Sequence, residues 1–140
     1  MKTLIIKTLS VLSLVLVLSP FAKAADDQPE VMGILFYADW CSSCKVLEPQ
    51  LDQARTDSDL DNQSIVFVTL DLTGETTSHQ AKLLAQSLGL GDVYAANEGT
   101  TGFMLLVDAE TKHVVTRLTK ELTAEVISER IGIVIDHVSG

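Results

Sequence analysis

The sequence is poor in cysteine, proline and positive charge. It contains two cysteines, three prolines and ten Lys and Arg residues against nineteen Asp and Glu residues in 140 positions. The formal net charge of −9 disfavours nucleic acid and anionic membrane surfaces as partners, because both repel an acidic protein. No internal repeat or low-complexity tract follows the N-terminal region, so a repeat architecture is not expected.

A continuous apolar run long enough to cross a membrane is also lacking. Residues 4–18 are mostly apolar but contain Lys7 and fall short of the roughly 20 residues that a spanning helix needs. Lys2 and Lys7 precede the apolar run at 9–18, and Ala22-Lys23-Ala24 fits a small-x-small cleavage site. The sequence therefore predicts a signal peptide over 1–24, cleaved after Ala24, with an uncleaved anchor as the disfavoured alternative.

Removal of the predicted signal leaves a chain suited to a single domain. The signal holds three of the ten Lys and Arg residues and no Asp or Glu, so the remaining 116 residues carry a net charge of −12. Residues 25–30 read as a flexible polar lead-in, and 31–140 as one compact domain with one core. We expect a monomer exported to the periplasm.

Apolar patterning predicts alternating strands and helices. Four strands are expected, at 31–37, 65–70, 103–107 and 113–118, with Val114, Thr116 and Leu118 on one face of the last. A helix is expected from Ser42, kinked at Pro49 and followed by a turn region at 55–64. A second is expected around 81–88, ending near Gly89, and a third after a Thr123 cap. The predicted class is α/β, a mixed sheet in the order βαβα-ββα with helices on both faces.

The two cysteines are only three positions apart, at Cys41 and Cys44, directly after the first predicted strand. A disulfide persists in an oxidising compartment, so a structural crosslink is one interpretation. A loop this short, however, constrains little of the unfolded chain and gives little stability. The spacing therefore favours a reactive or metal-binding pair over a structural one.

The stretch FYADWCSSCK, followed by Pro49, resembles the active-site segment of thioredoxin-like proteins. The order of predicted elements fits the thioredoxin fold too, so the resemblance covers essentially all of the chain after the signal. It implies thiol-disulfide exchange, with Cys41 as the nucleophile, Cys44 as the resolving thiol and a Cys41–Cys44 disulfide in the oxidised state. A Cys at the start of a helix lies where free N–H groups and the helix dipole stabilise a thiolate, which supports this assignment.

Neighbouring residues are expected to tune this chemistry. Trp40 is expected to pack beside the cysteines and shape the substrate surface, with a core tryptophan as the alternative. Lys45 is expected to add positive potential, against Asp39 and the overall negative charge. Ser42 and Ser43 can offer hydroxyl groups to a thiolate or simply cap the helix.

Two positions depart from the family pattern. Leu35 stands where thioredoxins usually carry a buried acidic residue that assists the resolving Cys, and Glu48 is the only nearby substitute. Thr101, followed by Gly102, stands where the family has a cis-proline facing the Cys pair, and a cis bond is much less favourable before threonine. The loop at 101 is therefore expected to take a different path, and we expect slower or more specialised exchange.

Two other functions compete with exchange. Without the cis-proline, the cysteines could hold copper or zinc, with His79, His113 and His137 as candidate further ligands. A redox-inert interaction domain is the third hypothesis, whereas c-type haem attachment is excluded because Lys45 replaces the required histidine. For exchange, no organic cofactor is expected, and the expected partners are protein thiols or disulfides and a membrane or periplasmic redox protein.

Overall fold

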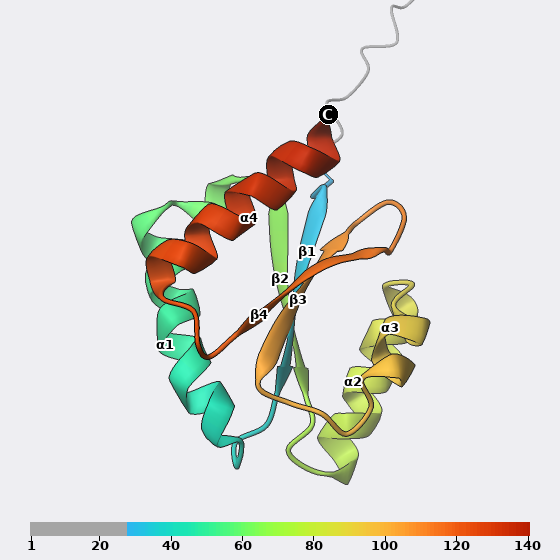
Figure 1. Cartoon of the computed structure of the whole chain (residues 1–140). Helices are drawn as coiled ribbons and strands as arrows, with labels where there is room; N and C mark the ends of the chain where they lie inside the picture. Colours follow the sequence, from blue (N-terminus) through green and yellow to red (C-terminus); the bar gives the residue numbers. More distant parts are fainter. Residues whose placement is uncertain (1–27) are drawn as a thin grey trace, which may run out of the picture.

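The computed structural model describes residues 28–140, which form a four-stranded sheet with helices on both faces (Figure 1). The signal peptide predicted for 1–24 lies outside the described residues. The strands are β1 (Val31–Tyr37), β2 (Ile65–Asp71), β3 (Phe103–Asp108) and β4 (Val114–Thr119). The helices are α1 (Ser42–Asp57), α2 (Glu75–Ser87), α3 (Gly91–Ala96) and α4 (Ala124–Ser139), with a short 3₁₀ turn, η1 (Leu60–Asn62). The predicted mixed α/β class is confirmed.

The sheet has the order β2-β1-β3-β4. β1 pairs in parallel with β2 and antiparallel with β3, and β4 pairs antiparallel with β3. As an inner strand covered on both faces, β1 is buried over nearly its whole length, which explains its continuous apolar sequence. The parallel pairing brings the carboxyl ends of β1 and β2 together, with Tyr37 opposite Asp71.

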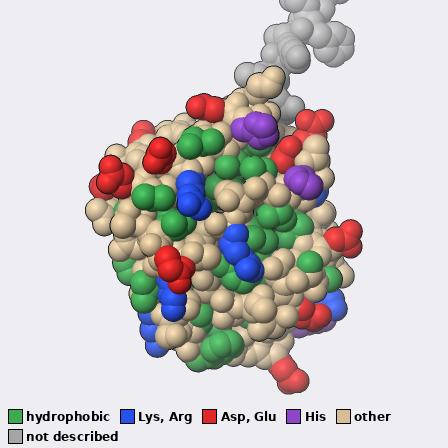
Figure 2. All heavy atoms as spheres, in the orientation of Figure 1, with side chains coloured by type: hydrophobic (Ala, Val, Ile, Leu, Met, Phe, Trp, Pro, Cys, Tyr) green, Lys and Arg blue, Asp and Glu red, His purple; other side chains and the backbone are tan. Residues whose placement is uncertain are grey.

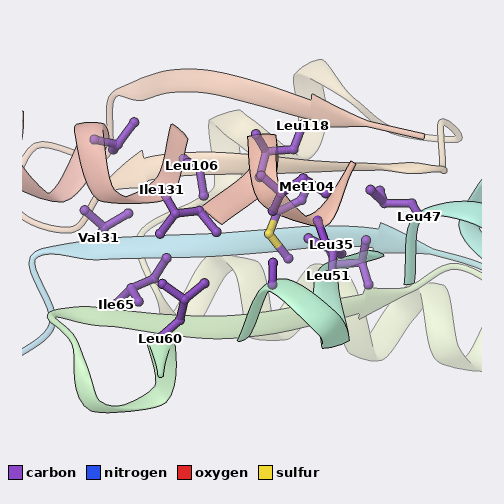
Figure 3. Close-up of a cluster of buried hydrophobic side chains, with 14 residues drawn as sticks. Val31, Leu35, Leu47, Leu51, Leu60, Ile65, Met104, Leu106, Leu118 and Ile131 are labelled. Carbon is purple, nitrogen blue, oxygen red and sulfur yellow. The ribbon is translucent and has the colours of Figure 1, made fainter. Parts of the chain in front are cut away.

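Two apolar layers hold the helices to the sheet. On one face, α1 and α4 pack over a cluster that includes Leu35, Leu47, Met104 and Ile131 (Figure 3). On the other face, α2 and α3 pack over a second cluster that includes Phe36, Leu70 and Tyr94. Among the described residues, no helix is long and apolar enough to cross a membrane.

Several predicted boundaries were wrong in informative ways. α1 runs through Pro49 as expected, but it extends to Asp57, into the region predicted to be a turn, and η1 occupies another part of that region. α3 was not predicted, because six residues are too few to display a helical period. Gly89, at φ +75°, separates α3 from α2.

The predicted alternation along β4 was also wrong at its start. A register irregularity lies between Leu106 and Val107 of β3, where the partner residue changes from Thr116 to Val114. Val115 consequently packs against the same apolar cluster as Leu118, while Val114 is exposed. A bulge shifts which side chains share a face, and the apolar pattern alone does not reveal it.

Candidate active site

Cys41 and Cys44 lie at the junction of β1 and α1. The chain leaves β1 at Tyr37 and turns through Ala38, whose carbonyl accepts a hydrogen bond from the Cys41 N–H at 3.1 Å. Cys41 is the N-cap of α1, and its sulfur accepts a hydrogen bond from the Cys44 N–H at 3.1 Å. Both cysteines are free thiols in this structure, and their side chains are buried, with 6% of Cys41 and 0% of Cys44 exposed.

The surroundings shift the pKa values of the two thiols in opposite directions. Burial alone raises the pKa of Cys41, but hydrogen bonds from the Cys44 thiol, the Thr101 side chain and the N–H groups of Cys44 and Ser43 bring it below its ordinary value. Burial, the hydrogen bond donated to Cys41 and the negative charge of Cys41 raise the pKa of Cys44 to about 11. Cys41 is therefore the more acidic thiol of the pair, and the buried Cys44 thiol donates a hydrogen bond to the Phe36 carbonyl at 3.8 Å.

The loop containing Thr101 and Gly102 covers the Cys pair directly. The Gly102 N–H donates to the Phe36 carbonyl at 2.8 Å, which fixes the loop against the end of β1. A Cβ atom on Gly102 would lie 3.3 Å from the Cys41 sulfur and 2.6 Å from the Ser43 Cβ. With φ at +91°, this position requires glycine both for its backbone and for its space.

The Thr101-Gly102 loop therefore lies against the Cys pair without the cis bond that the family uses. Every peptide bond in residues 28–140 is trans. The Thr101 side chain provides one of the hydrogen bonds that lower the pKa of Cys41. Proline has no side-chain donor, so this position adds an interaction that the family residue cannot make.

Trp40 and Lys45 lie on the outside of the site. Trp40 is 61% exposed, and its Nε1–H donates to the Thr73 carbonyl at 3.1 Å, so the alternative of a core tryptophan was wrong. The Thr73 hydroxyl also accepts from the Asp39 N–H at 3.0 Å. Lys45 is exposed and is not among the groups with the largest effects on the pKa of Cys41.

The serines of the motif act through the backbone. Cys41, and not Ser42 or Ser43, provides the side-chain cap of α1. The Ser43 N–H contributes to the lowered pKa of Cys41, whereas the Ser43 hydroxyl is not among the groups with the largest effects on that pKa. The alternative in which the serines cap α1 was therefore wrong, since the cysteine sulfur provides the cap itself.

Leu35, at the position where the family has a buried acidic residue, belongs to the apolar core. Leu35 is buried, and it lines a cavity of about 100 Å³ together with half-buried Glu48. Tyr37 packs against the cysteines, and its pKa is raised. Burial is the largest cause, followed by the negative charges of Glu48, Asp39 and Asp71. None of these carboxylates is among the groups with the largest effects on the pKa of Cys41.

The three histidines are not gathered at the cysteines. No group of three or more Cys, His, Asp or Glu side chains in residues 28–140 is arranged to hold a metal ion. His79 is exposed on α2, and His113 and His137 line one surface hollow. His113 precedes the start of β4, which pairs with the end of β3. That end of β3 pairs with the start of β1, whereas the cysteines follow the other end of β1.

Sequence reasoning missed the roles of Thr73 and Gly102. Thr73 follows β2, and its contact with the Cys segment follows from the parallel pairing of β1 and β2, which places both strand ends at one edge. Gly102 was noticed only as a neighbour of Thr101. Its signal was present, because a glycine just before a buried strand is a residue type that permits close backbone approach.

Comparison with known proteins agrees with this geometry. The family model described as Thioredoxin matches residues 13–85, which is more than half of the chain. The chain therefore belongs to the thioredoxin family. A comparison with curated protein sequences finds no significant match.

Solved structures share the fold at low sequence identity. A thiol:disulfide interchange protein of the thioredoxin family from Chlorobium tepidum has a TM-score of 0.52 and 15% identity, covering 79% of this chain and 83% of that one. Tryparedoxin from Trypanosoma brucei has a TM-score of 0.50 and 13% identity, covering 74% and 76%. Tryparedoxin II from C. fasciculata has a TM-score of 0.50 and 11% identity, covering 74% and 73%. The thioredoxin-like fold predicted from the sequence is confirmed.

Proposed function

We propose that this protein is an exported thiol-disulfide oxidoreductase that acts on protein thiols and disulfides through Cys41 and Cys44. The observation that carries the proposal is the opposite shift of the two thiols: the pKa of Cys41 is lowered at the start of α1, and that of buried Cys44 is raised to about 11. Membership of the thioredoxin family supports the same reaction class. The protein works as a monomer without an organic cofactor.

The reaction proceeds through two exchanges. The Cys41 thiolate attacks one sulfur of a substrate disulfide, forms a mixed disulfide and releases the other substrate sulfur as a thiolate. Cys44 then loses its proton and attacks the Cys41 sulfur, which breaks the mixed disulfide. The substrate gains two electrons and leaves as a dithiol, and the protein is left with a Cys41–Cys44 disulfide; the reverse sequence oxidises a substrate dithiol.

Several neighbouring groups have defined roles in this scheme. Thr101 and the N–H groups at the start of α1 hold the Cys41 thiolate, and Trp40 offers an exposed aromatic surface beside it. Lys45 remains at the rim, where it faces an incoming substrate. A periplasmic or membrane redox protein regenerates the pair after each cycle.

Replacement of each cysteine tests the assignment. Cys44→Ser should accumulate a mixed disulfide with a model substrate such as oxidised glutathione, because the resolving step is lost. Cys41→Ser should form none and should show no exchange. Equal adduct formation by both variants, or exchange activity in Cys41→Ser, would contradict the assigned roles. Absence of exchange in the wild type would favour a redox-inert interaction domain.

A further inference from the structure

A second surface of the molecule lies along β4, the edge strand of the sheet. Among the described residues β4 pairs only with β3, so its other side presents backbone N–H and C=O groups to solvent. An edge of this kind is a template for an additional strand. Proteins usually protect such edges, so the residues around the edge of β4 indicate what kind of strand it could bind.

A groove between β4 and α4 runs beside the free edge. Two hollows, of about 600 and 320 Å³, share Val115 and His137 and so form one continuous depression. Ile133 lines the groove from α4 and is 59% exposed, which is unusual for isoleucine. Figure 2 shows hydrophobic side chains gathered on this face between histidine and basic side chains.

The same edge collects positive charge on an otherwise acidic protein. Of the seven Lys and Arg residues beyond residue 24, four lie between 112 and 130, against three Glu residues, so this segment has a net charge of +1. Within residues 28–140 the one ion pair joins Arg55 and Asp61, so Arg117, Lys120 and Arg130 have no carboxylate within 4 Å. Asp108 also lines the groove, but its carboxylate accepts hydrogen bonds from the N–H groups of its own loop.

One face of β4 is apolar and the other carries a positive charge, so an added strand should alternate apolar and acidic side chains. Val115 and Leu118 pack toward the cluster beneath α4. Arg117 lies on the opposite face, with its guanidinium 3.6 Å from the centre of the Phe103 ring and a hydrogen bond to Asn97. A strand added beside β4 alternates its side chains between these faces. Apolar side chains would meet Ile133 on one face, and acidic side chains would meet Arg117 on the other.

We propose that β4 and the groove beneath α4 bind an extended segment of a partner protein in which apolar and acidic residues alternate. The segment adds a fifth strand to the sheet at β4, and its carboxylates pair with Arg117 and Lys120, which form no ion pair with another described residue. A second copy of this chain fits less well, because two β4 edges would bring their Arg117 and Lys120 side chains together. This docking does not depend on the redox reaction at Cys41.

A peptide titration tests the proposal. The probe is an acetylated and amidated octapeptide that alternates glutamate and valine, added to ¹⁵N-labelled protein. We expect saturable changes in the amide signals of Val114–Thr119, with binding that weakens as salt is added. An octapeptide that alternates lysine and valine should not produce them.

Matched variants separate the groove from the rest of the surface. Arg117→Glu should weaken binding about fivefold, because it replaces an attraction with a repulsion, and Ile133→Ser should weaken it as well. Lys82→Glu and Leu83→Ser change equally exposed residues on α2 and should bind the peptide like the wild type. The proposal is overturned if the amides of β4 do not respond, if both peptides bind equally, or if the free protein dimerises through β4. Exchange kinetics with a small disulfide should be unchanged in all four variants, which keeps this outcome separate from the proposed redox function.

Discussion

Two identical side chains three positions apart acquire opposite properties in this protein. The Cys41 sulfur accepts a hydrogen bond from the Cys44 N–H at the start of a helix, whereas the Cys44 thiol is fully buried one turn later and donates to the Phe36 carbonyl. The position of Cys41 at a helix start could be predicted from the sequence, because an apolar strand is followed at once by a helical pattern. The contact with Thr101 could not, because it joins residues 60 positions apart through the path of a loop.

Thr101→Val should raise the pKa of Cys41 by about half to one unit, which corresponds to the loss of one hydrogen bond of about 1 kcal/mol. The hydrogen bond lowers the pKa in the wild type, so the thiolate persists to lower pH than an ordinary thiol allows. Without it, the rate of attack on a disulfide should fall at pH 7 and recover at higher pH. The measurement is the thiolate absorbance at 240 nm of the reduced protein as a function of pH.

Thr101→Ser provides the control, because it keeps the hydroxyl group and removes only a methyl group. It should retain the wild-type pKa of Cys41. If Thr101→Val and wild type titrate together, the threonine fills space over the sulfur and does not hold the thiolate.

At the scale of elements, long segments were predictable and short irregular ones were not. The strands at β1, β2 and β3 and the helices α1 and α4 were expected because apolar residues recur over several turns or along whole strands. The extent of α2, the six residues of α3 and the irregularity beside Val115 depend on local turns and on packing. The loop before β3 belongs to the second group, although it shapes the active site.

The fit of this loop depends on Gly102. Gly102→Ala should lower the free energy of unfolding by about 2–4 kcal/mol, because it adds backbone strain and a clash with Ser43. The measurement is urea unfolding of the reduced protein.

Gly99→Ala separates the two causes. Gly99 also has a positive φ, at +78°, but a Cβ there would meet nothing within 4 Å. It should cost only about 1–2 kcal/mol for the left-handed backbone. Equal losses in the two variants would show that Gly102 is required for its backbone conformation alone and that the loop is not tightly packed on the Cys segment.

At the scale of the whole molecule, the sequence was sufficient for the fold class and the location of the reactive pair. The order of strands and helices leads to a mixed sheet because a strand-helix-strand unit closes as a parallel pair and a hairpin adds antiparallel strands. The distribution of charge in space could not be predicted in the same way. Arg130 of α4 lines the groove beside Val115 and Thr116 of β4 only because α4 packs across the sheet.

Export can be tested on the whole chain. The protein produced with its own N-terminus should be recovered from the periplasm with the mass of residues 25–140, because cleavage is expected after Ala24. Intact-mass measurement of the periplasmic and membrane fractions checks this. A full-length product held in the membrane fraction would show instead that the N-terminal segment acts as an anchor.

The central claim is that Cys41 and Cys44 form a reversible redox pair. Its most direct test is the reduction potential, measured by equilibrating the protein in thiol-disulfide buffers of defined potential, trapping free thiols by alkylation and counting adducts by mass. We expect a single two-electron transition in which both thiols disappear together, within the range from about −270 mV for a reductase to about −120 mV for an oxidant. A pair that cannot be cycled between dithiol and disulfide at any potential would contradict the account.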